Sequence, residues 1–349
     1  MQYEKFMTKC IQLAHLGEGH VSPNPLVGCV VLDKDGNEIS TGFHAKYGEN
    51  HAERDALLKL KNGEEKGGTL IVNLEPCSHF GKTPPCTDLI IERGIKRVVI
   101  GMRDVNPKVD GIKKLKDAGI EVIEGVLEKE CRQLNEIFIK NMTLQKTFIA
   151  IKTAATLDGK IATQSGSSKW ITSENARAEV KKIRNRYDAI MTTSATILAD
   201  NPTMEHRKKI ILDRELKTDS NTQIYQSGEL FIFYNGKNPP PNPLPLRAGE
   251  YINTPVIDNK LDLEFVFTKA HSLGIQSILI ESGGHLNGEA LKFADKIYHF
   301  IAPKITGDNK SRSCFDYRHI DDINDCKNFT IDSVENFAPD ILLTYYPNL

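Results

Sequence analysis

The chain has 349 residues, and its 45 basic and 46 acidic side chains leave a formal net charge of −1. The length indicates two domains, and a composition of 40% hydrophobic and 26% charged residues excludes a disordered or collagen-like protein. The balanced charge argues against nucleic acid as a partner, and no apolar run is long enough for a membrane-spanning helix. The N-terminus lacks the features of a signal peptide, and seven cysteines without framework spacing fit a reducing compartment, so we expect a cytoplasmic protein.

The first part of the chain alternates between strand and helix patterns. A tight turn at Asp35-Gly36-Asn37 joins two strands into a hairpin. Hydrophobic periodicity predicts strands at 27–32, 38–44, 69–73, 97–100 and 120–123, and helices at 6–14, 52–60, 87–93, 113–118 and 128–142. Alternation of this kind predicts a sheet covered by helices.

A second series of elements begins at Phe148. Ser173 is a suitable N-cap for a helix that continues through Arg184. The patterns predict strands at 148–153, 189–193, 209–212, 230–234, 277–281 and 297–302, and another helix at 263–272. We therefore place a boundary near Thr147, which divides the chain into domains 1–146 and 147–349.

One low-complexity segment interrupts the second part, because Asn238 to Leu246 contains five prolines. Proline at this density favours an extended surface loop, and a ligand for an SH3-type domain is the less favoured alternative. Nothing else in the sequence assigns this loop a role.

The strongest chemical signal is a histidine followed by two separated cysteines, His51, Cys77 and Cys86. One imidazole and two thiolates supply three ligands of a tetrahedral zinc ion and leave the fourth position for water, whose pKa zinc lowers. Glu53 lies at a predicted helix start, where its carboxylate can face that position and transfer protons without binding the metal. The alternative is a buried histidine with two unrelated cysteines. The cysteine spacing is longer than the common Cys-x-x-Cys, but the residue types and their order favour zinc.

Longer strings around these residues point to a family. They are PNPLVG from Pro23, GFH from Gly42, HAE from His51, EPCSHFGKTPPC from Glu75 and DVNP from Asp104. These strings resemble the bacterial bifunctional riboflavin-biosynthesis deaminase/reductases, and the resemblance extends over nearly the whole chain.

The resemblance implies that the first domain is similar in fold to cytidine deaminases, with an αβα architecture. It implies removal of an amino group from a phosphorylated ribosylaminopyrimidine, with Zn²⁺ bound by His51, Cys77 and Cys86 and proton transfer by Glu53. An amide can hydrogen-bond to a ring edge, and a flexible ammonium can meet a phosphate. The residues that match positions contacting the pyrimidine or its ribose phosphate are Asn24, His44, His79 and Lys82.

The second domain lacks the Gly-x-Gly-x-x-Gly fingerprint, so a standard dinucleotide-binding fold is not supported. Gly283 and Gly284 instead lie between a predicted strand and a helix, where backbone amides can approach a phosphate; a simple tight turn is the alternative. Further strings resemble the reductase half of the same family. They are KTAATLDGK from Lys152, SGSSKWITS from Ser165, TSATILADNP from Thr193 and APK from Ala302.

That half of the family is similar in fold to dihydrofolate reductase, an α/β domain, and uses NADPH to reduce the ribosyl group to ribityl. The residues matched to cofactor positions are Ala154, Trp170, Thr196, Asp200, Gly283, Gly284 and Gly288. Those matched to substrate positions are Ser168, Arg184, Arg207 and Glu281. Lys152 and Glu281 are the candidate catalytic pair at the sugar.

Two departures from the family's pattern concern arginines. Arg207 ends a varied string, PTMEHR, and a very short loop follows it. Arg214 stands where a serine is usual, and we expect its guanidinium to meet the 2′-phosphate of NADPH; a solvent-exposed arginine is the alternative. The departures keep open a deaminase with a weakened or inactive reductase half. A non-catalytic, zinc-stabilised nucleotide-binding protein is the other alternative, and the sequence also leaves a homo-oligomer open.

Overall fold

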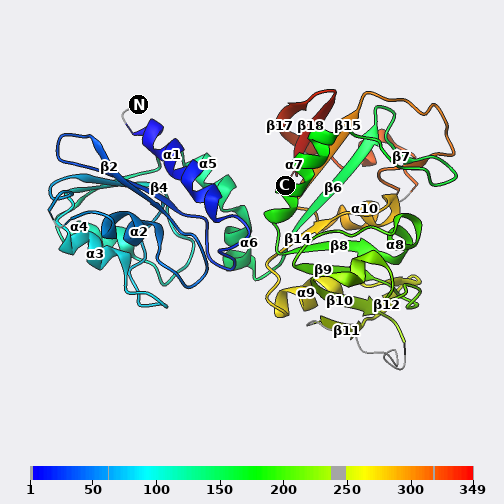
Figure 1. Ribbon diagram of the computed structural model, residues 1–349, viewed down its shortest axis with the longest axis horizontal. Coiled ribbons are helices and arrows are strands. Elements are labelled where there is room, and N and C mark those ends of the chain that lie inside the picture. Colours follow the sequence, from blue (N-terminus) through cyan, green and yellow to red (C-terminus); the bar gives the residue numbers. More distant parts are fainter. Residues whose placement is uncertain (1–2, 62, 237–248, 317–318, 349) are drawn as a thin grey trace. The chain divides into compact units, whose positions relative to one another are not determined.

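The structure is a computed structural model that describes residues 3–61, 63–236, 249–316 and 319–348. The chain divides into two compact units, Met1–Gln145 and Lys146–Leu349. In each of them helices pack against a central sheet (Figure 1). The proline-rich segment 238–246, which we expect to be a loop, lies outside the described residues.

The first unit is built around a five-stranded sheet of order β2-β1-β3-β4-β5. Its strands are β1 Gly28–Leu32, β2 Glu38–Phe43, β3 Thr69–Leu74, β4 Arg97–Met102 and β5 Glu121–Glu124. β1 pairs antiparallel with β2 and β3, whereas β3, β4 and β5 run parallel. Every residue of β1 and β3 is buried, which explains why both appear in the sequence as nearly continuous apolar runs.

Helices cover both faces of this sheet, with α1 and α5 on one side and α2, α3 and α4 on the other (Figure 1). The helices are α1 Glu4–Ala14, α2 Ala52–Leu58, α3 Cys86–Glu92, α4 Gly111–Asp117, α5 Glu128–Leu134 and α6 Glu136–Leu144. The start of α2 lies directly against β2, because a Cβ added at Gly42 would be 2.4 Å from the Ala52 carbonyl oxygen. Only glycine permits this approach, which holds His51 and Glu53 close to the sheet.

The single helix predicted at 128–142 is wrong, because the structure has two helices that meet at Asn135. The backbone of this residue leaves the helical region, with φ −105° and ψ 19°. Its side-chain oxygen accepts a hydrogen bond from the Leu26 amide at 2.8 Å, and its side-chain nitrogen donates to the Leu26 carbonyl at 3.0 Å. These partners are distant in sequence, so helical periodicity carried no sign of the break.

The second unit contains a nine-stranded sheet of order β11-β10-β9-β8-β14-β6-β15-β18-β17. The strands from β11 to β15 in this order run parallel, and β18 and β17 continue the sheet antiparallel. Their bounds are β6 Phe148–Thr156, β8 Ala189–Thr193, β9 Lys208–Leu212, β10 Glu229–Tyr234, β11 Gly249–Asn253, β14 Ser277–Ile280, β15 Lys296–Ala302, β17 Phe329–Phe337 and β18 Asp340–Pro347. The carboxyl ends of the parallel strands therefore share one edge, where such sheets commonly bind ligands.

The helices of this unit are α7 Glu174–Asn185, α8 Ser194–Asp200, α9 Leu263–Ser272 and α10 Gly284–Ala290. The predicted cap of α7 is confirmed, since the Ser173 hydroxyl accepts a hydrogen bond from the Ala176 amide. The short strands β7 Lys160–Ala162, β12 Val256–Ile257, β13 Lys260–Leu261 and β16 Arg312–Ser313 lie outside the main sheet. Sequence periodicity missed these, as well as β11, α8 and the β17–β18 hairpin, in which β17 is largely exposed and polar.

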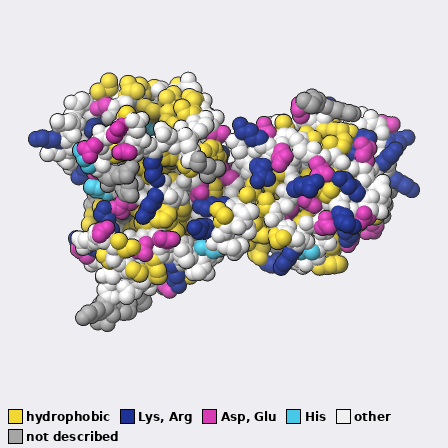
Figure 2. All heavy atoms as spheres, turned by 180° about the vertical axis from the view of Figure 1, so that it is seen from behind, with side chains coloured by type: hydrophobic (Ala, Val, Ile, Leu, Met, Phe, Trp, Pro, Cys, Tyr) yellow, Lys and Arg dark blue, Asp and Glu magenta, His cyan; other side chains and the backbone are white. Residues whose placement is uncertain are grey.

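Acidic and basic side chains alternate over the face of the molecule drawn in Figure 2, without a continuous basic field. This agrees with the balanced composition of the chain. None of the helices in the described part of the chain has the length and hydrophobicity that a membrane crossing requires.

Candidate active sites

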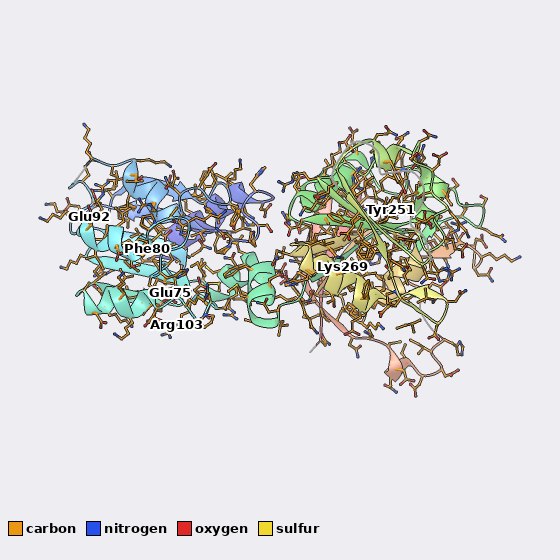
Figure 3. The ribbon with its side chains drawn as sticks, turned by 90° about the horizontal axis from the view of Figure 1, so that it is seen from below. Glu75, Phe80, Glu92, Arg103, Tyr251 and Lys269 are labelled. Atoms are coloured by element: carbon orange, nitrogen blue, oxygen red, sulfur yellow. The ribbon has the colours of Figure 1, made fainter. Side chains whose placement is uncertain are left out.

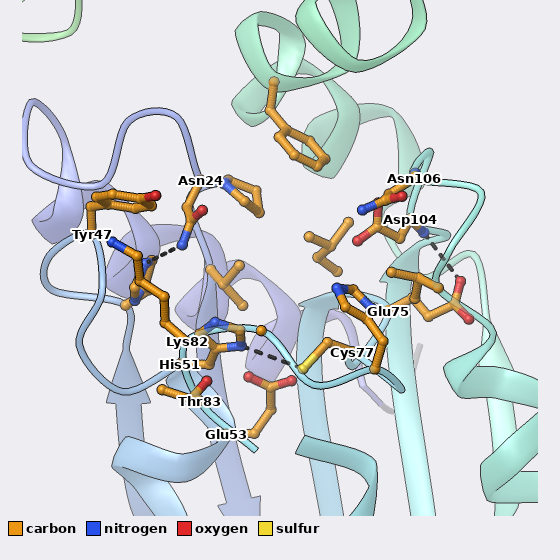
Figure 4. A pocket seen from close by; sticks show the side chains of 18 of the residues that line it. Asn24, Tyr47, His51, Glu53, Glu75, Cys77, Lys82, Thr83, Asp104 and Asn106 are labelled. Carbon is orange, nitrogen blue, oxygen red and sulfur yellow. Dashed lines mark hydrogen bonds between the residues drawn. The ribbon is translucent and has the colours of Figure 1, made fainter. Parts of the chain in front are cut away.

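The three predicted zinc ligands come from separate elements of the first unit and meet at one point. His51 precedes α2 as its N-cap residue, Cys77 lies in the loop after β3, and Cys86 is the first residue of α3. Figure 4 shows His51 beside Cys77. The Nδ1 atom of His51 lies 3.5 Å from the sulfur of each cysteine. All three donor atoms lie within 4.8 Å of one another, so the fold assembles residues that the sequence separates.

The spacing of these atoms fits zinc. Zinc binds histidine nitrogen at about 2.0–2.1 Å and cysteine sulfur at about 2.3 Å in tetrahedral sites. Tetrahedral angles then place nitrogen and sulfur about 3.6 Å apart, and the His51–cysteine separations are 3.5 Å. The Cys86 amide also donates a hydrogen bond to the Cys77 sulfur at 3.3 Å, an arrangement that favours a thiolate.

Glu53 lies beside the ligands without belonging to their cluster. It is in the first turn of α2, and its side chain is buried. Burial, together with the nearby Cys77, raises the pKa of Glu53 to about 6. Hydrogen bonds from the Cys86 side chain, from His51 and from the Cys86 amide hold the pKa of Cys77 at about 4. The site thus pairs a thiolate ligand with a buried carboxyl group.

A cavity of about 280 Å³ opens over this cluster. Glu53, His51 and Cys77 face it (Figure 4). The four predicted substrate residues also line it, and they are Asn24, His44, His79 and Lys82. The structure therefore brings all of these sequence candidates into one pocket.

Hydrogen bonds set the orientation of the polar groups on one wall. His44 Nδ1 faces the Asn50 carbonyl oxygen at 3.0 Å and must carry the hydrogen. Its Nε2 therefore accepts from the Asn24 side-chain amide at 3.1 Å, and burial lowers the pKa of His44, which favours this neutral form. His79 Nδ1 is buried and has no hydrogen-bond partner within the described residues, so it is available to a ligand.

Lys82 lies at the pocket beside an aromatic ring that the sequence did not single out. Its Nζ is 3.8 Å from the centroid of the Tyr47 ring, a cation–π contact. The lysine stem passes close to Gly48, whose φ of +88° suits glycine. Tyr47 and Gly48 also line the cavity. Nothing in the local sequence distinguishes Tyr47 from other exposed aromatic residues.

The other wall carries Asp104 and Asn106, which belong to a family string but had no assigned role. Buried Glu75 holds this wall in position, because its carboxylate accepts hydrogen bonds from the backbone amides of Asp104 at 3.1 Å and Ile112 at 2.9 Å. Burial raises the pKa of Asp104 to about 6. Glu75 is buried, whereas Phe80, from the loop before α3, is 78% exposed. Figure 3 labels both residues in the first unit.

The second unit has a larger cavity of about 870 Å³. It lies at the shared carboxyl edge of the sheet, where Thr193 ends β8 and Glu281 follows β14. The predicted residues that line it are Lys152, Ala154, Ser168, Thr196, Asp200, Glu281, Gly283 and Gly284. Most of the predicted reductase residues are therefore collected at one cavity.

Glu281 is the centre of an ionic cluster at this cavity. Its carboxylate accepts two hydrogen bonds from Arg184, at 2.6 and 3.0 Å, and one from Lys152 Nζ at 3.2 Å. Burial alone would raise the pKa of Glu281, but Lys152 and Arg184 lower it to about 2. The carboxylate is consequently ionised at neutral pH and orients Lys152 toward the cavity.

Two predicted residues contribute differently from the expectation. Arg184 is absent from the cavity lining and reaches the site only through Glu281. Gly288 is buried within α10 rather than at its start. Gly284 is required by packing, because a Cβ there would lie 2.3 Å from the Ser313 carbonyl oxygen.

Three more predicted residues are also absent from the cavity lining. Trp170 is 65% exposed, with the Arg177 guanidinium 4.5 Å from its ring. Arg207 immediately precedes β9, at the opposite end of that strand from Arg214. Arg214 pairs with Glu215 and donates to the Asn259 carbonyl.

Comparison with known families divides the chain in the same way as the two cavities. Residues 1–102 match the family model of the cytidine and deoxycytidylate deaminase zinc-binding region. Residues 147–343 match that of the RibD C-terminal domain.

Similar proteins cover the chain from end to end. The riboflavin biosynthesis protein RibD of Actinobacillus pleuropneumoniae is 38% identical, over 97% of this chain and 94% of its own length. RibD of Escherichia coli is 34% identical, over 98% and 99%. A crystal structure of a diaminohydroxyphosphoribosylaminopyrimidine deaminase/5-amino-6-(5-phosphoribosylamino)uracil reductase from Thermotoga maritima superposes with a TM-score of 0.89, 39% identity and 99% of each chain covered. Acinetobacter baumannii RibD gives a TM-score of 0.85 at 30% identity, with 100% and 99% covered.

Proposed function

Because the chain belongs to the RibD family of bifunctional deaminase/reductases of riboflavin biosynthesis, we propose that its two parts divide the two reactions. The enzyme uses zinc for deamination and NADPH for reduction. Residues 1–146 deaminate 2,5-diamino-6-ribosylamino-4(3H)-pyrimidinone 5′-phosphate, and residues 147–349 then reduce its ribosyl group to ribityl. This substrate has the chemistry named for the Thermotoga maritima protein.

The cluster of His51, Cys77 and Cys86 beside buried Glu53 is the observation that carries the deaminase assignment. These three residues hold the zinc ion, which when bound acts as a Lewis acid and lowers the pKa of a coordinated water. Glu53 takes the proton of the water that attacks the amino-bearing ring carbon. It then delivers the proton to the departing nitrogen, which leaves as ammonia.

Polar residues of the same pocket recognise the substrate. The Asn24 amide, oriented by His44, hydrogen-bonds to the pyrimidine ring and its amino groups. So does Nδ1 of His79, which has no partner in the part of the chain that the structure describes. Lys82, beside Tyr47 at the pocket, supplies a positive charge to the ribose phosphate. These roles are supported by the position of each side chain in the cavity.

In the reductase site the ionic cluster at Glu281 defines the chemistry. NADPH supplies the hydride that reduces C1 of the sugar. Glu281 stays ionised and holds Lys152, whose ammonium protonates the ring oxygen released when the sugar opens. Ser168 contacts the substrate, and the cofactor lies along Ala154, Thr196, Asp200, Gly283 and Gly284, all of which line the cavity.

A two-product assay tests this assignment. Zinc-loaded protein is supplied with the phosphorylated diaminopyrimidine and NADPH, and ammonia release and NADPH oxidation are followed separately. We expect both, with NADPH oxidation depending on prior deamination. Ammonia without NADPH oxidation would indicate a deaminase with an inactive reductase half, and neither product would indicate a non-catalytic protein.

Metal content provides an independent test of the zinc ligands. Cys77→Ser and Cys86→Ser should each lower zinc occupancy and deamination together, since a neutral hydroxyl is a much poorer ligand than a thiolate. Cys326→Ser, which changes a cysteine outside the cluster, is the control and should retain a full equivalent of zinc. Full zinc occupancy in both ligand variants would contradict the assignment.

A further inference from the structure

A segment of the second unit, residues 306–316, forms part of the wall of the larger cavity. We call it the strap. It follows β15 and includes β16, which pairs antiparallel with β7. Six of its residues line the cavity together with the Gly283–Gly284 turn, and they are Asn309, Lys310, Ser311, Arg312, Ser313 and Asp316. None of the strap was among the residues that the sequence pointed to.

The backbone of the strap is held at its beginning by Asp158. The Asp158 carboxylate accepts hydrogen bonds from the Thr306 amide at 3.2 Å, the Thr306 hydroxyl at 2.8 Å and the Gly307 amide at 3.0 Å. Within the strap, Asp308 accepts hydrogen bonds from the Lys310 amide at 2.9 Å and the hydroxyl of buried Ser311 at 3.2 Å. Side chains that leave this backbone therefore start from a defined position.

The far end of the strap is joined to the glycine turn. The Asp316 amide donates to the Gly284 carbonyl at 3.0 Å, and the Cys314 amide donates to the Gly159 carbonyl at 3.0 Å. The Ser313 carbonyl oxygen lies so near Gly284 that a Cβ there would be 2.3 Å away. The strap and the Gly283–Gly284 turn are consequently adjacent parts of one wall.

Two cations project from the strap without an internal partner. Within the described residues, the side chains of Lys310 and Arg312 make no hydrogen bond or ion pair, and both are exposed. A terminal nitrogen of Arg312 lies 3.4 Å from the position of a Cβ at Gly166, on the facing loop of the cavity. Lys152, which also lines this cavity, by contrast forms an ion pair with Glu281.

The acidic groups of the strap, of its anchor and of the cavity lining have other partners. Asp316 lies 3.3 Å from His285, and Asp158 and Asp308 accept backbone and hydroxyl hydrogen bonds of the strap. Glu281 is bound to Arg184 and Lys152, and Asp200 accepts a hydrogen bond from Ser168. A pair of positive charges on a fixed backbone, facing a cavity and lacking carboxylate partners, is suited to bind an anionic ligand.

We propose that Lys310 and Arg312 bind the diphosphate of NADPH. The inference rests on the proposed assignment of this cavity to the cofactor. NADPH carries phosphate at two places, the diphosphate and the 2′-phosphate. We assign the diphosphate to the strap because the strap packs directly on Gly284, in the turn where backbone amides can approach a phosphate. Arg214, the candidate for the 2′-phosphate, lies elsewhere, after β9, where it pairs with Glu215. The guanidinium of Arg312 supplies a bidentate contact, and the Lys310 ammonium supplies a second charge.

Equilibrium binding tests this proposal without relying on turnover. NADPH and NADH are titrated separately into wild type, Lys310→Ala, Arg312→Ala and Arg312→Lys, and cofactor fluorescence is followed without substrate. Lys181→Ala removes an exposed charge from α7, outside the cavity, and is the matched control. We expect Kd to rise roughly tenfold in each alanine variant for both cofactors, less in Arg312→Lys, and not at all in Lys181→Ala.

The outcomes separate this proposal from the function on which it rests. Failure of wild type to bind NADPH would refute the assignment of the cavity to the cofactor. Wild-type binding with unchanged Kd in both alanine variants would overturn the role of the strap. A change for NADPH alone would overturn the diphosphate in favour of the 2′-phosphate. If the cofactor Kd is unchanged in the alanine variants, a raised KM for the pyrimidine, measured separately by steady-state kinetics, would assign the cations to the phosphate of the substrate instead.

Discussion

Two buried glutamates show how the surroundings of a residue decide its chemistry. Burial raises the pKa of Glu53 to about 6, whereas at Glu281 the same effect is outweighed by Lys152 and Arg184, which lower the pKa to about 2. The difference supports the roles proposed for them: Glu53 as the carboxylate that exchanges protons, and Glu281 as one that keeps its charge and orients a lysine, although the two side chains are chemically identical.

Replacing Glu53 with glutamine tests the first of these roles. Glu53→Gln should lower the rate of ammonia release by roughly 10²–10⁴-fold, because the amide keeps the size of the side chain but cannot transfer a proton. Zinc content, measured on the same sample, should remain that of wild type. Loss of zinc together with activity would show instead that Glu53 supports or binds the metal.

Lys82 offers a test of phosphate recognition in the same pocket. Lys82→Ala should raise KM for the phosphorylated pyrimidine roughly ten- to hundredfold, since it removes a hydrogen bond between charged groups. The dephosphorylated substrate should be affected little. Lys34→Ala, in the turn between β1 and β2, provides an exposed lysine outside the pocket as a control. An equal loss for both substrates would argue for a structural role of Lys82.

Arg214 remains the candidate for recognition of the 2′-phosphate, although it pairs with Glu215 and the Asn259 carbonyl. Arg214→Ala should raise the KM for NADPH roughly ten- to hundredfold and leave that for NADH nearly unchanged. Steady-state kinetics with both cofactors supply the measurement. An equal change in KM for the two cofactors, or no change for either, would show that Arg214 has only a structural role, the hydrogen bond to the Asn259 carbonyl.

At the scale of secondary-structure elements, the deaminase pocket depends on side-chain hydrogen bonds that hold the segment before β1 in place. Asn73 and Asn135 both donate hydrogen bonds to the Leu26 carbonyl, and Asn73 also accepts one from the Gly28 amide. These contacts fix the segment that carries Asn24 into the pocket. The break between α5 and α6 is thus the means by which Asn135 reaches this segment.

Asn135→Ala should destabilise the first unit by about 1–3 kcal/mol, because the Leu26 amide loses its side-chain acceptor and the Leu26 carbonyl keeps Asn73 but loses its second donor. Denaturant unfolding followed by circular dichroism would measure this loss. If the alanine merely joined α5 and α6 into one helix at no cost, stability would be unchanged or higher, and the proposed function of the break would be wrong.

At the scale of the whole molecule, the two catalytic sites lie in units that each have their own sheet and hydrophobic core. Among the residues that the structure describes, those lining the smaller cavity all belong to the first unit and those lining the larger all belong to the second. The two activities should accordingly be lost independently.

Supplying the deaminated intermediate to Glu53→Gln protein tests this independence. The variant should oxidise NADPH at the wild-type rate, because every residue assigned to the reductase site is intact. Conversely, Lys152→Ala should release ammonia normally and fail to oxidise NADPH. A reductase rate that falls with Glu53→Gln would show that the sites are coupled.

The sequence by itself determined the features that depend on short stretches of chain. Most predicted strands and helices are present, because period-two and helical patterns reflect local geometry. The residues that the sequence assigned to the deaminase site also come together in the structure, since they lie in short, chemically distinctive motifs. His51, Cys77 and Cys86 form one cluster, and Asn24, His44, His79 and Lys82 line the cavity over it.

Tertiary structure alone decided what depends on contacts between distant residues. It broke one predicted helix at Asn135 and placed Tyr47 against Lys82. It also put Lys310 and Arg312 into the reductase cavity while leaving Arg207 outside its lining. No local pattern encodes such outcomes, because hydrogen bonding, burial and charge pairing depend on which side chains the folded chain brings together.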